Sequence, residues 1–126
     1  MKLNQVTVAV NAIEPAVAFY RGMGLRLIVL SPHYARFECP DGDATFSLHL
    51  AHDPVPQLAT VIYFECDDLD DRVARLRAQG FEFTQLPRDE RWLWREARIK
   101  DPSGNEICLY FAGENRKNPP WRLQDI

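Results

Sequence analysis

An internal repeat is the feature of this sequence that most restricts its possible folds. Five structural positions of the first half recur in the second half at one constant offset of 56 residues. The pairs are Val10 and Cys66, Ile13 and Leu69, Val17 and Val73, Tyr20 and Leu76, and Gly24 and Gly80. Because chance rarely preserves one offset over five such positions, the sequence predicts two copies of one structural unit.

Each copy opens with the same local pattern. Val6, Val8 and Val10 alternate with Thr7 and Ala9, which is typical of a half-buried strand. Apolar residues at helical spacing follow over residues 13–20, and Gly24 marks the end of this helix. The second copy repeats the order, with a strand at about 61–66 and a helix that Gly80 ends.

Three more strands complete each copy, so each unit reads β-α-β-β-β and the fold class is α+β with two tandem βαβββ modules. In both copies the last two strands are joined by residues that favour turns, at 40–43 and 101–105. The predicted strands lie at about 25–30, 34–39, 44–50, 81–84, 92–99 and 106–111. One domain over residues 1–126 is expected, with modules at about 2–50 and 60–112, a linker at about 51–59 and an irregular tail at 113–126.

Composition excludes several classes of protein. The formal net charge of −3, with charges of both signs intermixed, argues against a nucleic-acid partner. No run approaches the roughly 20 apolar residues of a membrane helix, so no membrane association is expected. The cysteines Cys39, Cys66 and Cys108 are odd in number and widely spaced, which predicts free thiols in a reduced, cytoplasmic protein.

Strand alternation predicts an apolar face toward the helices and a polar, aromatic face on the other side. The second face is where we expect a ligand. Its predicted members are Gln5, Thr7, Thr45, Ser47, His49, Tyr63, Glu65, Trp94, Glu96, Arg98, Glu106, Cys108 and Tyr110.

Two residues of that polar face are candidates for catalysis. His49 stands between Leu48 and Leu50 and is a candidate general base or metal ligand; the alternative is a solvated strand histidine. Glu65 is a candidate for acid–base work. Arg98 is able to hold an anionic substrate, while the alternative for these charges is cross-strand ion pairing, such as Glu96 or Glu106 with Arg98 or Arg95.

Aromatic residues and a thiol complete the candidate site. Trp92 and Trp94 are predicted to share one face of a strand, where they line a pocket, seal a dimer contact or lie under the tail. Cys108 is a nucleophile only if a neighbour lowers the pKa of its thiol. In the tail, Trp121 and Leu123 are expected to pack over the domain or on a partner chain, because their exposure to water is unfavourable.

Two motifs resemble the vicinal oxygen chelate superfamily, the group of glyoxalases, bleomycin resistance proteins and ring-cleaving dioxygenases. Residues 18–25, which read AFYRGMGL, resemble the end of its first helix, and residues 101–107, which read DPSGNEI, resemble its turn into the last strand. The resemblance covers about residues 2–112. It implies a cupped mixed sheet with the helices outside, and a homodimer.

The resemblance also implies four positions for metal ligands, which the group usually fills with His, Glu or Gln. They fall on Gln5, Ser47, Val61 and Cys108, of which Gln5 alone is a usual ligand. A shift of two residues keeps the same strand face and puts His49 or Tyr63 at two of these positions.

Three functions follow as hypotheses. The first is a resistance-protein-like module that binds a small planar or aromatic molecule in the cup, without the standard metal site and with no cofactor. The alternative is a lyase, isomerase or dioxygenase that uses a divalent metal held by Gln5 and His49; a metal-free enzyme with His49 or Glu65 as base is a third option. The expected ligand-binding residues are Gln5, Ser47, His49, Tyr63, Trp94, Arg98, Cys108 and Tyr110.

Overall fold

The computed structural model describes residues 1–55 and 60–124. The predicted linker at 51–59 therefore lies partly outside the described residues, as do the last two residues of the tail. Eleven elements occur in chain order within these described residues. They are β1 (Gln5–Val10), α1 (Ile13–Gly22), β2 (Arg26–Ser31), β3 (Tyr34–Glu38), β4 (Thr45–Leu50), β5 (Val61–Glu65), α2 (Leu69–Ala78), β6 (Phe83–Asp89), β7 (Arg95–Lys100), β8 (Glu106–Phe111) and the 3₁₀ helix η1 (Gly113–Arg116).

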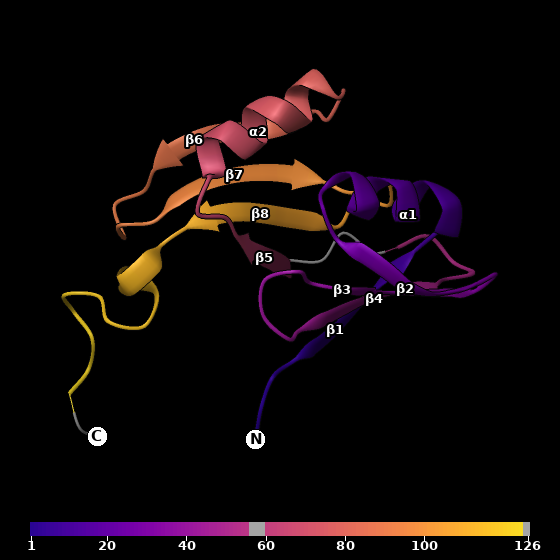
Figure 1. Ribbon diagram of the computed structural model, residues 1–126, viewed down its shortest axis with the longest axis horizontal. Helices are drawn as coiled ribbons and strands as arrows, with labels where there is room; N and C mark the ends of the chain where they lie inside the picture. Colours follow the sequence, from indigo (N-terminus) through magenta and orange to yellow (C-terminus); the bar gives the residue numbers. More distant parts are fainter. Residues whose placement is uncertain (56–59, 125–126) are drawn as a thin grey trace. The chain divides into compact units, whose positions relative to one another are not determined.

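The strands form two four-stranded mixed sheets, ordered β1-β4-β3-β2 and β5-β8-β7-β6 (Figure 1). In each sheet the first strand pairs in parallel with the last strand of its module, and the other pairs are antiparallel. The predicted α+β class and the two tandem βαβββ modules are confirmed. The closure of the sheets into a cup stays a prediction.

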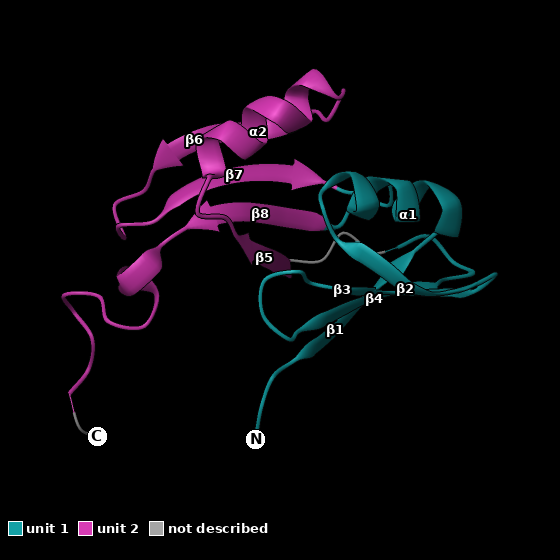
Figure 2. Ribbon diagram, in the orientation of Figure 1, with its two compact units in different colours: residues 1–59, 101–105 teal, residues 60–100, 106–126 magenta. Residues whose placement is uncertain are grey.

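Contacts divide the chain into two compact units (Figure 2). The first contains Met1–Ala59 and Asp101–Asn105, and the second contains Thr60–Lys100 and Glu106–Ile126. The turn between β7 and β8 therefore belongs by its contacts to the first unit. There Ser103 Oγ accepts a hydrogen bond from the backbone N–H of Asn11 at 3.0 Å, and Asn105 Nδ2 donates to the carbonyl of Ala9 at 2.8 Å.

Each helix covers the apolar face of its own sheet. In the first unit the ring of Tyr20, on α1, lies 4.8 Å from the ring of Phe46 and 6.0 Å from that of Phe37, measured between centroids. In the second unit Val73 and Leu76 are the buried residues of α2 beyond its first turn. Core side chains on β7 and β8 are Ala97, Ile99, Ile107 and Leu109. No helix within the described parts of the chain is long and apolar enough to cross a membrane.

The predicted strand at 92–99 starts three residues later than expected, at Arg95. A tight turn precedes it, closed by hydrogen bonds from the N–H of Glu90 to the carbonyl of Trp94 and from the N–H of Leu93 to the carbonyl of Glu90. Leu93 has a φ of +69°, a left-handed conformation that ends regular strand pairing. The prediction that Trp92 and Trp94 share a strand face is therefore wrong, because both residues lie in this turn.

The tail begins with η1 and continues without regular structure as far as residue 124, where the described residues end. The predicted packing of Trp121 and Leu123 over their own domain is wrong, because these side chains are 57% and 72% exposed. Their packing on a partner chain stays a prediction.

Candidate functional site

The polar face of the second sheet gathers most of the predicted site residues. Strand pairing places Tyr63, Cys108 and Arg98 in one row across β5, β8 and β7. The next row contains Glu65, Tyr110 and Glu96. These residues alternate with the apolar residues that face α2, so the predicted strand parity is confirmed at these positions.

Three aromatic side chains meet on this face, and we call Tyr63, Trp94 and Tyr110 the aromatic cluster. The rings of Trp94 and Tyr110 are stacked, with 4.8 Å between centroids and an interplanar angle of 26°. Tyr63 meets both rings edge to face, at 5.9 Å from Trp94 and 5.4 Å from Tyr110. Tyr110 is buried, Trp94 is partly buried and Tyr63 is 43% exposed, so the cluster is anchored on one side and open on the other.

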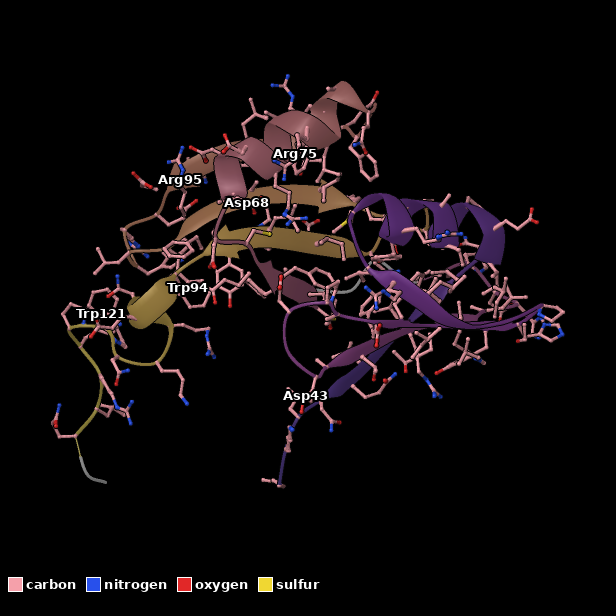
Figure 3. All side chains as sticks on the ribbon, viewed as in Figure 1. Asp43, Asp68, Arg75, Trp94, Arg95 and Trp121 are labelled. Atoms are coloured by element: carbon pink, nitrogen blue, oxygen red, sulfur yellow. The ribbon has the colours of Figure 1, made fainter. Side chains whose placement is uncertain are left out.

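Trp94 reaches this face although it lies outside β7. Its neighbour Arg95 points toward α2, where its guanidinium binds the carboxylate of Asp70 at 2.9 Å (Figure 3). Trp94 turns the other way and packs against Cys108 and Tyr110. The turn before β7 thus supplies a ring to the cluster.

An ion-pair network borders the aromatic cluster. Glu96 is 2% exposed, and its carboxylate accepts hydrogen bonds from Trp92 Nε1 at 2.7 Å and from Arg98 Nη2 at 3.1 Å. A second carboxylate, that of Glu106, lies 3.9 Å from Arg98 Nη1. The ion pairing expected from the sequence is confirmed, although Glu96 and Arg98 lie on the same strand, β7, so that the cross-strand pair is Arg98 with Glu106 on β8. Arg98 also lies over the ring of Tyr63, with 5.7 Å from its Cζ to the centroid.

Glu65 faces the tail. Its Oε2 accepts hydrogen bonds from the backbone N–H groups of Ala112 and Gly113, both at 2.8 Å, and its Oε1 lies 3.8 Å from Arg116 Nε. The carboxylate therefore holds the first turn of η1. Its role as a catalytic base stays a prediction.

Cys108 is fully buried between these groups. Burial, followed by the charge of Glu96, raises the pKa of its thiol to about 12. The thiol keeps its proton at neutral pH, which is the opposite of the activation that a nucleophile needs. All three cysteines are free thiols.

The first sheet carries a separate polar cluster, which we call the Tyr34 network; its members are Gln5, Tyr34, Arg36, Thr45 and Ser47. Gln5 Nε2 donates to Ser47 Oγ at 2.5 Å, and Thr45 Oγ1 donates to Gln5 Oε1. Ser47 Oγ lies 2.7 Å from Tyr34 Oη, and Arg36 Nε donates to the same phenolic oxygen at 2.8 Å. The sequence reasoning missed Tyr34 and Arg36, although their alternation with the buried Ala35 and Phe37 signals the polar face.

His49 lies on the same face as this network but further along β4. It is exposed and pairs in register with Tyr34 on β3 and Ala9 on β1. Gln5 pairs with Thr45, four residues earlier on β4, so the backbones of Gln5 and His49 are about 13 Å apart along the strands. Joint binding of one ion would need Gln5 to leave its hydrogen bonds.

The residues at the four family metal positions do not fit a metal site. In the first unit the amide of Gln5 binds Ser47, a neutral hydroxyl that is a weak ligand. In the second unit Val61 has no donor atom, and Cys108 holds its proton. Over residues 1–55 and 60–124, no group of three or more His, Cys, Asp or Glu side chains is placed to hold a metal ion.

A groove of about 580 Å³ lies elsewhere in the first unit. It is formed by the start of α1 and the end of β2, and Glu14 is the charged residue of its lining. None of the predicted site residues lines it.

Known structures share this fold. A lactoylglutathione lyase from Agrobacterium tumefaciens superposes with a TM-score of 0.71 at 20% identity, over 87% of this chain and 92% of that one. A glyoxalase/bleomycin resistance protein/dioxygenase from Nocardioides gives 0.72 at 25% identity, over 98% and 90%. TioX from Micromonospora sp. ML1 gives 0.71 at 18% identity, over 89% and 99%.

Sequence comparison places the chain in a family. No curated protein matches it. The model of the Glyoxalase/Bleomycin resistance protein/Dioxygenase superfamily matches residues 2–109, which is most of the chain. The chain therefore belongs to the glyoxalase/bleomycin resistance protein/dioxygenase superfamily.

Proposed function

We propose that this protein binds a small planar or aromatic molecule at the aromatic cluster. The observation that carries the proposal is the exposed side of Tyr63 and Trp94, whose rings are anchored against the buried Tyr110 on β8. Tyr63 is 43% exposed, yet it is held edge to face by Trp94 and Tyr110. Ring faces fixed in this way bind a flat ligand without first losing side-chain freedom.

The charges around the cluster favour a cationic or neutral ligand over an anionic one. Three carboxylates border it, those of Glu65, Glu96 and Glu106, against the guanidinium groups of Arg98 and Arg116. Arg98, the group predicted to hold an anion, is already paired with Glu96. Indole and phenol rings also attract cations through their π faces.

Thioflavin T, a planar cation, is a suitable probe of this proposal. We expect saturable binding to the wild-type protein by isothermal titration calorimetry, and affinity at least about tenfold lower in Trp94→Leu, because one stacking face is lost. Trp121→Leu is the matched control, since Trp121 is exposed in the tail. An anionic planar dye, 8-anilinonaphthalene-1-sulfonate, should bind more weakly than thioflavin T. Equal affinity of the two Trp variants for thioflavin T would refute the proposal.

Catalysis through His49 or Glu65 is a distinct hypothesis. His49 is exposed on the first sheet, where a ligand is able to reach its imidazole. The alternative of a metal-dependent lyase, isomerase or dioxygenase rests on Gln5 and His49, and we rank it second because Gln5 is the one usual ligand among the four family metal positions. If His49→Ala leaves ligand affinity and any turnover unchanged, a central role for His49 is ruled out.

We further propose a cytoplasmic homodimer. The free thiols of Cys39, Cys66 and Cys108 agree with a reducing compartment. The exposed Trp121 and Leu123 are apolar residues that a second copy would cover. Analytical ultracentrifugation should give twice the chain mass for the wild type. A monomer at all concentrations would refute the dimer.

A further inference from the structure

Hydrogen bonds in the Tyr34 network run in one direction. Gln5 Nε2 also lies 3.4 Å from the carbonyl oxygen of Val6, which only accepts, so this end of the amide is the donor. It follows that Ser47 Oγ accepts from Gln5. Ser47 is 0% exposed, and Tyr34 Oη is its remaining hydrogen-bond partner among the described residues, so the hydroxyl of Ser47 donates to Tyr34.

The phenolic oxygen of Tyr34 thus accepts two hydrogen bonds, from Ser47 Oγ and from Arg36 Nε. With both acceptor positions used, the hydroxyl proton of Tyr34 points away from both partners. The hydrogen bond with Ser47, and then Arg36, lowers the pKa of this phenol, which makes its O–H a stronger donor.

Arg36 adds further free donors beside that hydroxyl. Its Nε is bound to Tyr34, while Nη1 and Nη2 have no hydrogen-bond partner in the part of the chain that the structure describes. Each of the other four arginines in strands lies 2.7–3.1 Å from a carboxylate oxygen. These are Arg26, Arg88, Arg95 and Arg98. Arg36 is therefore a strand guanidinium whose charge is not neutralised within the described residues.

We propose that Tyr34 and Arg36 form a binding site for a carboxylate group. The guanidinium offers a planar pair of N–H donors, which matches the two oxygens of a carboxylate. The outward hydroxyl of Tyr34 supplies a third donor. Arg36 is held in place by its bond to Tyr34, so the site is formed before the ligand arrives. This site lies on the first sheet and does not depend on the function proposed for the aromatic cluster.

Benzoate is the probe, followed by NMR of ¹⁵N-labelled full-length protein at constant ionic strength maintained with sodium chloride. We expect a saturable shift of the Arg36 Nε–Hε resonance. Arg36→Gln should weaken binding at least about tenfold, and Tyr34→Phe about threefold or more, because each removes donors to a charged group. Arg26→Gln is the matched control: its arginine is paired with Glu38, and benzoate affinity should stay within about twofold of wild type.

Titrations with two further compounds separate the effect of the ligand's charge from that of its shape. Benzamide, the neutral isostere, should give no saturable shift, and inorganic phosphate should bind more weakly than benzoate. Trp94→Leu should keep its affinity for benzoate even if it no longer binds thioflavin T. This difference makes the two proposals distinguishable. The carboxylate site is refuted if wild type gives no saturable shift, if Arg36→Gln binds as tightly, or if benzamide or phosphate matches benzoate. A dispersed spectrum of each variant verifies its fold.

Discussion

The hydroxyl of Tyr20 donates a 2.7 Å hydrogen bond to Oδ2 of Asp101, and both side chains are buried. The same carboxylate accepts hydrogen bonds from the backbone N–H groups of Ser103 and Asn105, both at 2.9 Å. Burial, and then the charge of Asp101, raises the pKa of the Tyr20 phenol, so it stays a donor throughout the neutral range. One residue of α1 thereby fixes the turn at 101–105 within the first unit.

Replacing Tyr20 should test the strength of this contact. We expect Tyr20→Phe to lower the free energy of unfolding by about 1–3 kcal/mol, because it removes one of the two side-chain hydrogen bonds that the buried Oδ2 of Asp101 accepts and leaves only that from Asn105 Nδ2. Urea denaturation measures the change. Tyr63→Phe is the control: its hydroxyl is exposed and 3.5 Å from Arg98, so we expect a change below about 0.5 kcal/mol. Equal stabilities of the two variants would contradict this account.

The left-handed backbone at Leu93 should be a point of strain. Leu93→Gly should raise the free energy of unfolding by about 1 kcal/mol, since glycine adopts a positive φ without a steric penalty. Leu86 is a matched control, because both leucines are 47% exposed and Leu86 lies in β6. Leu86→Gly should be destabilising. Thermal unfolding of both variants decides the sign, and a destabilised Leu93→Gly would contradict the prediction.

The buried thiol of Cys108 should make stability depend on pH above the ordinary thiol pKa. Burial raises its pKa in the folded protein from 9.0 to about 12. Below pH 9 both states hold the proton, and above it the unfolded chain loses the proton first. Stability should therefore fall as pH rises from 9 toward 12, by up to about 1 kcal/mol per pH unit from this group.

Urea unfolding of wild type and Cys108→Ala at pH 8, 9 and 10 measures that contribution. The variant should lose less stability over this range than wild type, whatever its stability at pH 8. Identical slopes would show that the thiol ionises alike in both states.

Metal content should be low under all conditions. Elemental analysis after incubation with nickel, zinc, manganese or iron(II) should give well below one ion per chain, because the family positions offer one usual ligand, Gln5. Near-stoichiometric metal that Gln5→Ala or His49→Ala removes would establish the metal-dependent alternative.

The fold could be predicted because both copies of the repeat place their apolar residues at the same spacing. α1 and α2 begin at Ile13 and Leu69, which is the offset read from the sequence. Strand parity likewise predicted that Tyr63, Arg98 and Cys108 share a face. These features depend on local periodicity, which a sequence displays directly.

The details of the site depend on conformations and contacts that local sequence patterns do not predict. Leu93 takes a conformation that favours glycine, so nothing in its residue type signalled a turn. Glu65 binds amides 47 and 48 residues later in the chain. Strand alternation places Tyr34 and Arg36 on the polar face, but it does not show that Gln5 donates to Ser47 and Ser47 to Tyr34.

The turn at 101–105 has a consequence for how the chain acquires its structure during synthesis. All the strands and the helix of the first unit are present once Leu50 has been made. The carboxylate of Asp101, which accepts the hydrogen bond from the Tyr20 hydroxyl, comes 81 residues after Tyr20. Contacts between residues so far apart form late and slow folding. The first half of the chain must therefore leave the ribosome before the Tyr20 hydroxyl has its acceptor, and it reaches its final form only after most of the second half has been translated.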